Sequence, residues 1–173
     1  MVRIPERFAD RLDAVGSPRP RLPPALNVRD AAVVALLMPG TGAREHDPTV
    51  VLIERNGQMR SHAGQVAFPG GKPDHDDASL AATALREASE EVGLPGDGAE
   101  VLGRLAPVPT PTGFCIWPFV AWAPSGWQPT NTSEGWGTWR GFEYEMHRFA
   151  VHEPPVWGAT ARIMWDLLER IRR

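Results

Sequence analysis

The sequence predicts an α/β fold in which a mixed β-sheet lies between helices. Two apolar, β-branched runs at residues 31–38 and 49–54 have the length and composition of buried strands. Residues 78–92 and about 157–172 instead repeat apolar side chains at the spacing of an amphipathic helix. The 173 residues suffice for one domain with a buried core, and two full domains are not expected.

The first 28 residues are expected to form a lead-in to this domain, which then spans residues 29–173. Residues 5–15 have the pattern of a short amphipathic helix. The proline-rich stretch at 17–24 ends that helix and is expected to continue as an extended connector. A turn-rich loop at 39–48 then separates the two predicted strands.

The helix predicted at 78–92 follows a bend rich in glycine and proline at 68–73. Asp76 and Asp77 are candidate N-caps, because a short side-chain oxygen can accept from the first free backbone N–H groups of a helix. Gly93 is the expected end of the helix, since glycine readily adopts the left-handed conformation found there.

The second half of the chain continues the mixed pattern. A turn is expected at 94–98, and further strands are expected at 100–106, 116–123 and 141–151. The amphipathic helix at about 157–172 completes the chain. No internal repeat is visible, so composition indicates no second domain boundary.

Charge and cysteine usage exclude several functional classes. The net charge of −3 and a pI near 5.9 argue against a surface that collects nucleic acid or anionic lipid. No apolar run reaches the roughly 18 to 20 residues of a membrane span, and residues 1–24 lack a secretory signal, so we expect a cytoplasmic protein. The single cysteine, Cys115, allows no internal disulfide and is expected to be buried.

The helix at 78–92 concentrates negative charge on one face. Its apolar stripe faces one side, whereas Glu87, Glu90 and Glu91 project on the other. Glu87 and Glu91 are like charges four residues apart, and all three lie where the helix dipole disfavours negative charge. The combined cost is about 1 to 3 kcal/mol before screening. A divalent cation would reverse it, although a solvated acidic face with Arg86 as a neighbour stays open as the alternative.

Two glycines precede this helix and change how the acidic face is interpreted. Gly70 and Gly71 follow Pro69, and without side chains they allow the backbone to turn sharply and approach a ligand or metal. The segment GKPDHDD at 71–77 and the segment REASEEVGL at 86–94 together resemble the Nudix box, G-x5-E-x7-R-E-U-x-E-E-x-G-U, where U is apolar.

The first half of the box departs from the pattern by one residue. Counting back from Arg86 places its first Glu at Ala78, whereas counting forward from Gly71 reaches Asp77. The same shift is expected of the coenzyme A-cleaving branch, whose box resembles GGK-x-D-x-x-D followed by TALREA-x-EEVGL. Here the segments read GGKPDHDD and TALREASEEVGL.

The resemblance implies a Nudix α/β/α sandwich and a metal-dependent pyrophosphatase. Glu87 and Glu91 are then the strongest ligands for Mg²⁺ or Mn²⁺, and Glu90 is another ligand or the general base. The Gly71 carbonyl is expected to complete the coordination, and Arg86 to orient a glutamate. The phosphoanhydride would be attacked by water without a covalent intermediate.

An upstream pattern of the same branch, L-L-T-x-R-[SA]-x3-R-x3-G-x3-F-P-G-G, is also matched with a few departures. The matching residues, expected to bind substrate, are Arg55, Arg60, Gly64, Phe68 and Gly70. Planar guanidinium groups suit the phosphates of coenzyme A, although surface arginines are the alternative reading. The implied products are 3′,5′-ADP and 4′-phosphopantetheine.

Three further residues are weaker candidates, and rival functions stay open. They are His62, Asp77 and Glu134, the last because the connection from it to a strand near Gly137 is shorter than in the family. One rival is a Nudix pyrophosphatase for another small nucleotide, ADP-ribose or a dinucleotide. The other is a non-catalytic nucleotide-binding module, and a homodimer is compatible with either.

Overall fold

The computed structural model describes residues 7–18, 28–39, 48–54, 65–96, 98–130, 136–140, 156 and 158–172. Within these residues eight strands form one sheet, accompanied by a short 3₁₀ helix and two α-helices. The elements are η1 (Ala9–Arg11), β1 (Arg29–Pro39), β2 (Pro48–Glu54), β3 (Val66–Ala67), β4 (Gly70–Gly71), α1 (Leu80–Val92), β5 (Glu100–Arg104), β6 (Val108–Pro109), β7 (Phe114–Trp122), β8 (Trp136–Arg140) and α2 (Gly158–Arg172).

Strand β1 lies at the centre of a mixed sheet whose main order is β3-β2-β1-β7-β5. It runs parallel to β7 over the whole length of β7, from Arg29 opposite Phe114 to Leu37 opposite Trp122. It is antiparallel to β2 near its end and antiparallel to the short β4 near its start. The start of β1 therefore adjoins both β7 and the glycine strand β4.

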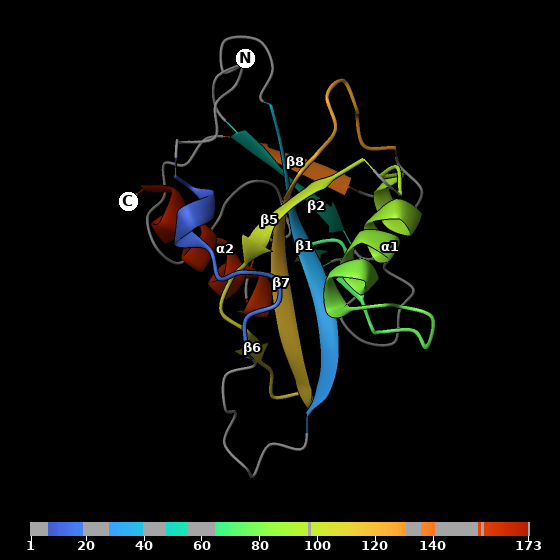
Figure 1. Ribbon diagram of the computed structural model, residues 1–173, viewed down its shortest axis with the longest axis vertical. Coiled ribbons are helices and arrows are strands. Elements are labelled where there is room, and N and C mark those ends of the chain that lie inside the picture. Colours follow the sequence, from blue (N-terminus) through green and yellow to red (C-terminus); the bar gives the residue numbers. More distant parts are fainter. Residues whose placement is uncertain are drawn as a thin grey trace.

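Helices α1 and α2 cover opposite faces of this sheet (Figure 1). Alternate residues of β1 divide between two buried clusters, with Val34 and Leu36 facing α1 and Ala35 and Leu37 facing α2. Because both faces are covered, β1 is buried almost continuously from Ala32 to Met38. The predicted α/β/α sandwich with a mixed sheet is confirmed.

Most predicted elements lie within a few residues of their expected places. The strands at 31–38, 49–54, 100–106 and 116–123 and the two main helices correspond to β1, β2, β5, β7, α1 and α2. Strand β8 begins at Trp136, close to the expected start near Gly137. The strand expected at 141–151 lies outside the described residues. In the described part of the chain, no helix is long and apolar enough to cross a membrane.

The helix expected at 5–15 is wrong in extent, since the described residues hold a single 3₁₀ turn at Ala9–Arg11. The chain becomes extended at Leu12 because Asp13 forms a β-bridge with Arg104, with N–H···O distances of 3.0 and 2.8 Å. Phe8 and Leu12 still pack into the core on the α2 face, as the amphipathic spacing required.

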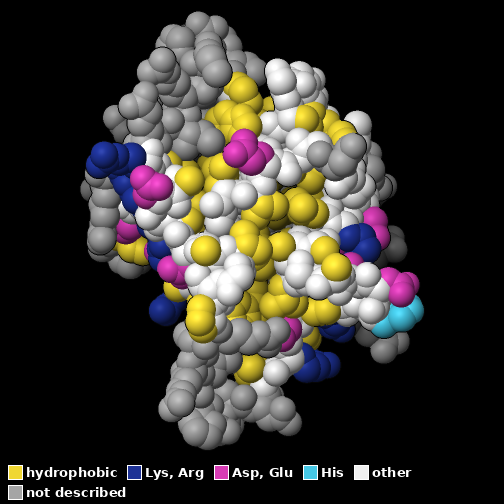
Figure 2. All heavy atoms as spheres, viewed as in Figure 1, with side chains coloured by type: hydrophobic (Ala, Val, Ile, Leu, Met, Phe, Trp, Pro, Cys, Tyr) yellow, Lys and Arg dark blue, Asp and Glu magenta, His cyan; other side chains and the backbone are white. Residues whose placement is uncertain are grey.

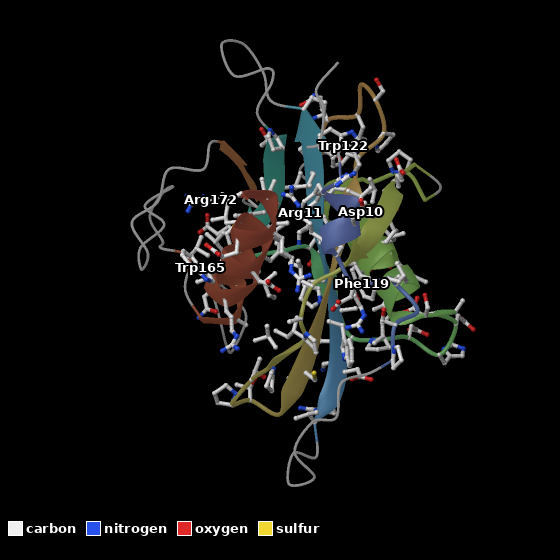
Figure 3. The ribbon with its side chains drawn as sticks, turned by 60° about the vertical axis from the view of Figure 1, so that its left-hand side comes forward. Asp10, Arg11, Phe119, Trp122, Trp165 and Arg172 are labelled. Carbon is white, nitrogen blue, oxygen red and sulfur yellow. The ribbon has the colours of Figure 1, made fainter. Side chains whose placement is uncertain are left out.

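Arg11 fastens this N-terminal turn to α2. Its Nη1 donates to the carbonyls of Arg170 and Ile171, at 3.0 and 3.2 Å. These carbonyls belong to the last turn of α2 and have no partner within the helix. Figure 3 shows η1 beside α2, with Arg11 directed toward the helix. The lead-in thus caps the end of a helix 160 residues further along the chain.

The N-cap of α1 also differs from the expectation. Ser79, and neither Asp76 nor Asp77, caps the helix by accepting from the Ala82 N–H at 3.1 Å. Asp77 is already engaged, because its carboxylate accepts from the Asp74 N–H and from Arg86. Gly93 ends the helix in the left-handed conformation, with φ 68°, as predicted.

Candidate active site

The two glycines of β4 bring the backbone against both β1 and α1. Gly70 has φ 151°, and a Cβ there would lie 2.3 Å from the Ala32 carbonyl oxygen. No side chain fits this position, because the obstructing atoms belong to the backbone of β1. Gly70 is therefore required by the packing of β4 on the sheet.

Gly71 also pairs with β1, but a side chain there would meet the helix α1. A Cβ on Gly71 would lie 2.3 Å from Oε1 of Glu87, so the glutamate occupies the space that a side chain would need. The N–H of Gly70 donates to Oε2 of Glu91 at 2.9 Å. The structure thus brings the glycine backbone and two carboxylates of α1 together, as the sequence led us to expect.

Arg86 gathers the neighbouring carboxylates around one guanidinium group. Its Nε and Nη2 donate to the two oxygens of Asp77 at 3.0 and 3.1 Å, a two-pronged contact. Nη1 reaches Glu90 at 3.2 Å, and Nη2 also contacts Glu87 at 3.1 Å and the Lys72 carbonyl at 3.2 Å. One cation therefore links the loop, the start of the helix and two of its glutamates.

The ion pair between Asp77 and Arg86 is the most strongly perturbed part of the site. Hydrogen bonds from Arg86 hold the pKa of the Asp77 carboxyl well below its usual range, and the Asp74 N–H acts in the same direction. The Asp77 carboxylate raises the pKa of Arg86 in turn. Only 7% of the Asp77 side chain is exposed, and the hydrogen bonds from Arg86 keep it charged despite that burial.

The one-residue shift in the sequence pattern has a structural explanation. Ala78, the position reached by counting back from Arg86, is exposed and carries no polar group. Asp77, one residue earlier, supplies the carboxylate instead. The Asp74 N–H donates to this carboxylate at 2.8 Å and holds the loop in place. Asp77 thus faces Arg86 and acts as its partner in the described structure.

The donors that meet here suit a hard divalent cation, because carboxylate and carbonyl oxygens are the ligands that Mg²⁺ takes. Glu87 and Glu91 lie beside the glycine backbone, whereas the Glu90 side chain is 60% exposed. Within the described residues the three glutamates do not form a group with oxygens all within 4.8 Å, since Glu87 and Glu90 turn to Arg86.

Such a close group does occur in the loop that precedes α1. It consists of Asp74, His75 and Asp76, all exposed, and the hydrogen bond from His75 lowers the pKa of Asp74. Figure 2 shows a histidine beside an acidic side chain at the edge of the molecule. The cluster is fully solvated, and exposed acidic side chains of this kind commonly have no bound ion.

Phe68 is buried in the core, and the predicted substrate-binding residues upstream of it lie outside the described part of the chain. The Phe68 side chain is only 2% exposed and packs in the core on the α2 face, so it presents no surface to a substrate. Its expected place in a binding surface is corrected to that of a support beneath the glycine strand. The predicted site residues that lie outside the described part of the chain are Arg55, Arg60, His62, Gly64 and Glu134.

Sequence reasoning missed a cationic cluster beside the glycines. The Arg29 guanidinium lies 4.4 Å from the centre of the Phe114 ring, and the Lys72 ammonium lies 5.7 Å from it. Lys72 follows Gly71 directly, whereas Arg29 and Phe114 meet only because β1 and β7 are parallel neighbours. No local signal in the sequence indicates that pairing.

Comparison with known proteins identifies the family. The NUDIX domain matches residues 28–154 of the chain. A Klebsiella aerogenes protein described as the uncharacterized Nudix hydrolase NudL is 49% identical over 107 residues, covering 62% of this chain and 84% of its own. The NudL of Yersinia enterocolitica is 53% identical over 146 residues, covering 72% of this chain and 75% of its own.

Solved structures show the same fold at low sequence identity. The Nudix hydrolase RenU from M. smegmatis superposes with a TM-score of 0.57 and 21% identity, over 83% of this chain and 84% of its own. A MutT/nudix family protein from Enterococcus faecalis gives 0.59 and 16%, over 88% of this chain and 65% of its own. The chain belongs to the NUDIX domain family and is a Nudix hydrolase, an enzyme of the pyrophosphatase type.

Proposed function

We propose that this enzyme hydrolyses the diphosphate of coenzyme A or its derivatives to 3′,5′-ADP and 4′-phosphopantetheine. The meeting of the Gly70–Gly71 backbone with Glu87 and Glu91 carries the proposal of diphosphate cleavage. The choice of coenzyme A rests on the resemblance of the segments GGKPDHDD and TALREASEEVGL to the coenzyme A-cleaving branch. We also propose that residues 29–173 form the catalytic domain.

Enzymes of this family generally use divalent metal ions, and we assign Mg²⁺ or Mn²⁺ here. Glu87, Glu91 and the Gly71 carbonyl would hold the ion, since their oxygen atoms fit its preference. When bound, the ion neutralises the diphosphate and lowers the pKa of the attacking water. Because water can then act as the nucleophile, no side chain needs to form a covalent intermediate.

Glu90 is our candidate for the general base. Its side chain is 60% exposed, so it faces solvent, and Arg86 Nη1 holds its carboxylate at 3.2 Å. Arg86 is in turn fixed by the sheltered carboxylate of Asp77. We therefore assign Asp77 and Arg86 as positioning residues that set the direction of Glu90 and Glu87.

Product analysis tests the substrate directly. Incubation of the full chain with coenzyme A and Mg²⁺ is expected to give 3′,5′-ADP and 4′-phosphopantetheine, which mass spectrometry distinguishes from other fragments. ADP-ribose and a dinucleoside polyphosphate are tested in parallel. If coenzyme A stays unchanged while ADP-ribose or the dinucleoside polyphosphate is cleaved rapidly, the assignment of coenzyme A is wrong. The assignment of diphosphate hydrolysis would still hold.

Glu90→Gln and Glu91→Gln are expected to lower kcat by about 100- to 10,000-fold, the range that a positioned general base or its equivalent supplies. Binding of coenzyme A measured by calorimetry should change much less, because the substitutions leave the fold intact. Glu100→Gln is the matched control, since Glu100 is exposed at the start of β5. Full activity in both site variants would remove Glu90 and Glu91 from the mechanism.

Substitution by alanine should lower activity at Gly71 and stability at Gly70. Gly71→Ala pushes against the movable end of Glu87, so we expect thermal stability near that of the wild type but kcat lowered by about 100-fold. Gly70→Ala meets backbone atoms of β1 and should lower the free energy of unfolding by about 1 to 3 kcal/mol. Equal thermal melting of the two variants would show that the packing differs from this description.

Asp77→Asn tests the positioning pair through pH. The folded pKa of Asp77 lies below its ordinary value of 3.8, so its stabilising contribution is complete above that pH and is lost as the pH falls toward the folded value. Urea unfolding should show the variant less stable than the wild type at pH 7, with the difference shrinking below about pH 4. Asp10→Asn, at an exposed site, is the control, and a pH-independent difference would contradict the ion pair.

A further inference from the structure

A second group of charges adjoins the cleavage site without belonging to it. Arg29 and Lys72 both lie against the ring of Phe114, at 4.4 and 5.7 Å from its centre. The sheet fixes this arrangement, since Arg29 is opposite Phe114 in the pairing of β1 with β7. Three residues further along β1, Ala32 is opposite Gly71, which directly precedes Lys72.

Both cations, Arg29 and Lys72, are exposed. Among the described residues neither Arg29 nor Lys72 forms an ion pair with a carboxylate, although acids are plentiful on the adjoining loop and helix. The ring face offers a cation only partial compensation, of order 0.5 to 1 kcal/mol at an exposed position. Two like charges held at one ring form a place where an anion would be stabilised by both.

The cluster is within reach of a ligand that is bound at the carboxylates. The Lys72 carbonyl accepts from Arg86 at 3.2 Å, and Gly71 touches Glu87, so the Lys72 backbone is part of the cleavage site. The Lys72 ammonium instead lies 5.7 Å from the centre of the Phe114 ring, and among the described residues it forms no ion pair with the helix glutamates. An anion bound beside Phe114 would therefore be a different group of the ligand from the diphosphate that lies at the glutamates.

We propose that Arg29, Lys72 and Phe114 form a subsite for a phosphomonoester on the nucleotide, separate from the diphosphate that is cleaved. This inference rests on the proposed function for its substrate, since coenzyme A carries such a phosphate on its ribose. The arginine supplies a planar fork and the lysine a mobile point charge, a combination that suits a terminal phosphate with three free oxygens. The subsite would favour coenzyme A over the same molecule without that phosphate.

Binding of two adenine nucleotides tests the subsite without turnover. Titration calorimetry should show 3′,5′-ADP binding to the wild-type chain at least about tenfold more tightly than AMP, since the two differ by one phosphate. Lys72→Met and Arg29→Met should each reduce this preference several-fold, and the double variant should bring it near unity. Lys72→Arg should preserve it, because the charge is kept.

Arg162→Met is the matched control, since Arg162 is an exposed arginine on α2, which covers the other face of the sheet. Thermal melting checks that all variants fold. A wild type that binds both nucleotides equally would overturn the subsite. A preference unchanged in Lys72→Met and Arg29→Met, or an equal loss for both nucleotides, would overturn it too.

Kinetics separates this inference from the proposed function. Values of kcat/KM for coenzyme A and dephospho-coenzyme A should differ in the wild type and converge in the Lys72→Met, Arg29→Met double variant. If the wild type cleaves neither compound, the proposed function fails. The binding comparison of 3′,5′-ADP with AMP then still decides whether the subsite exists.

Discussion

The contact between Gly71 and Glu87 is the constraint on which the site depends. A helix side chain can lie directly on a strand backbone only where that strand lacks Cβ, and here the glutamate carboxylate fills the missing space. Gly70 makes the same kind of contact with β1 on the sheet side. The two-residue strand β4 is therefore enclosed between sheet and helix, and it fixes the carboxylates relative to the central strand.

The acidic face of α1 is partly neutralised by the protein itself. The sequence alone suggested a repulsion of about 1 to 3 kcal/mol that a cation would relieve. Arg86 contacts the exposed Glu90 and the more sheltered Glu87 and Asp77, and an exposed ion pair such as the one with Glu90 is worth roughly 0.2 to 1 kcal/mol. These contributions are similar in size, so the charge density alone does not demand a metal ion. The stronger reasons are the glycine approach and the family to which the chain belongs.

The periodicity of apolar residues predicts the strands and helices well, because it follows from which side chains are buried. That pattern is present within each element's own sequence. Strand β1 alternates between two cores and α1 has a single apolar stripe, and both patterns are legible in the residues themselves. The errors arose where a distant partner decided the outcome. Asp13 lies outside the helix expected there because it pairs with Arg104. Asp77 does not cap α1 because its carboxylate pairs with Arg86. The Nudix box is legible in the sequence, but the partnership of Arg29 with Phe114 depends on strand order and is not.

The parallel pairing of β1 and β7 places the residues of the proposed phosphate subsite beside the glycine strand. Parallel strands place their starting residues at the same edge of the sheet, and here that edge adjoins the glycines that meet α1. Residues at the strand starts, such as Arg29 and Phe114, therefore lie close to the glycine strand, although they are far from the box in sequence. The atoms that crowd Gly71 belong to Glu87, not to these strand ends. Under the proposed subsite, strand ends such as Arg29 and Phe114 would set substrate preference, while the loop and helix would carry out the cleavage.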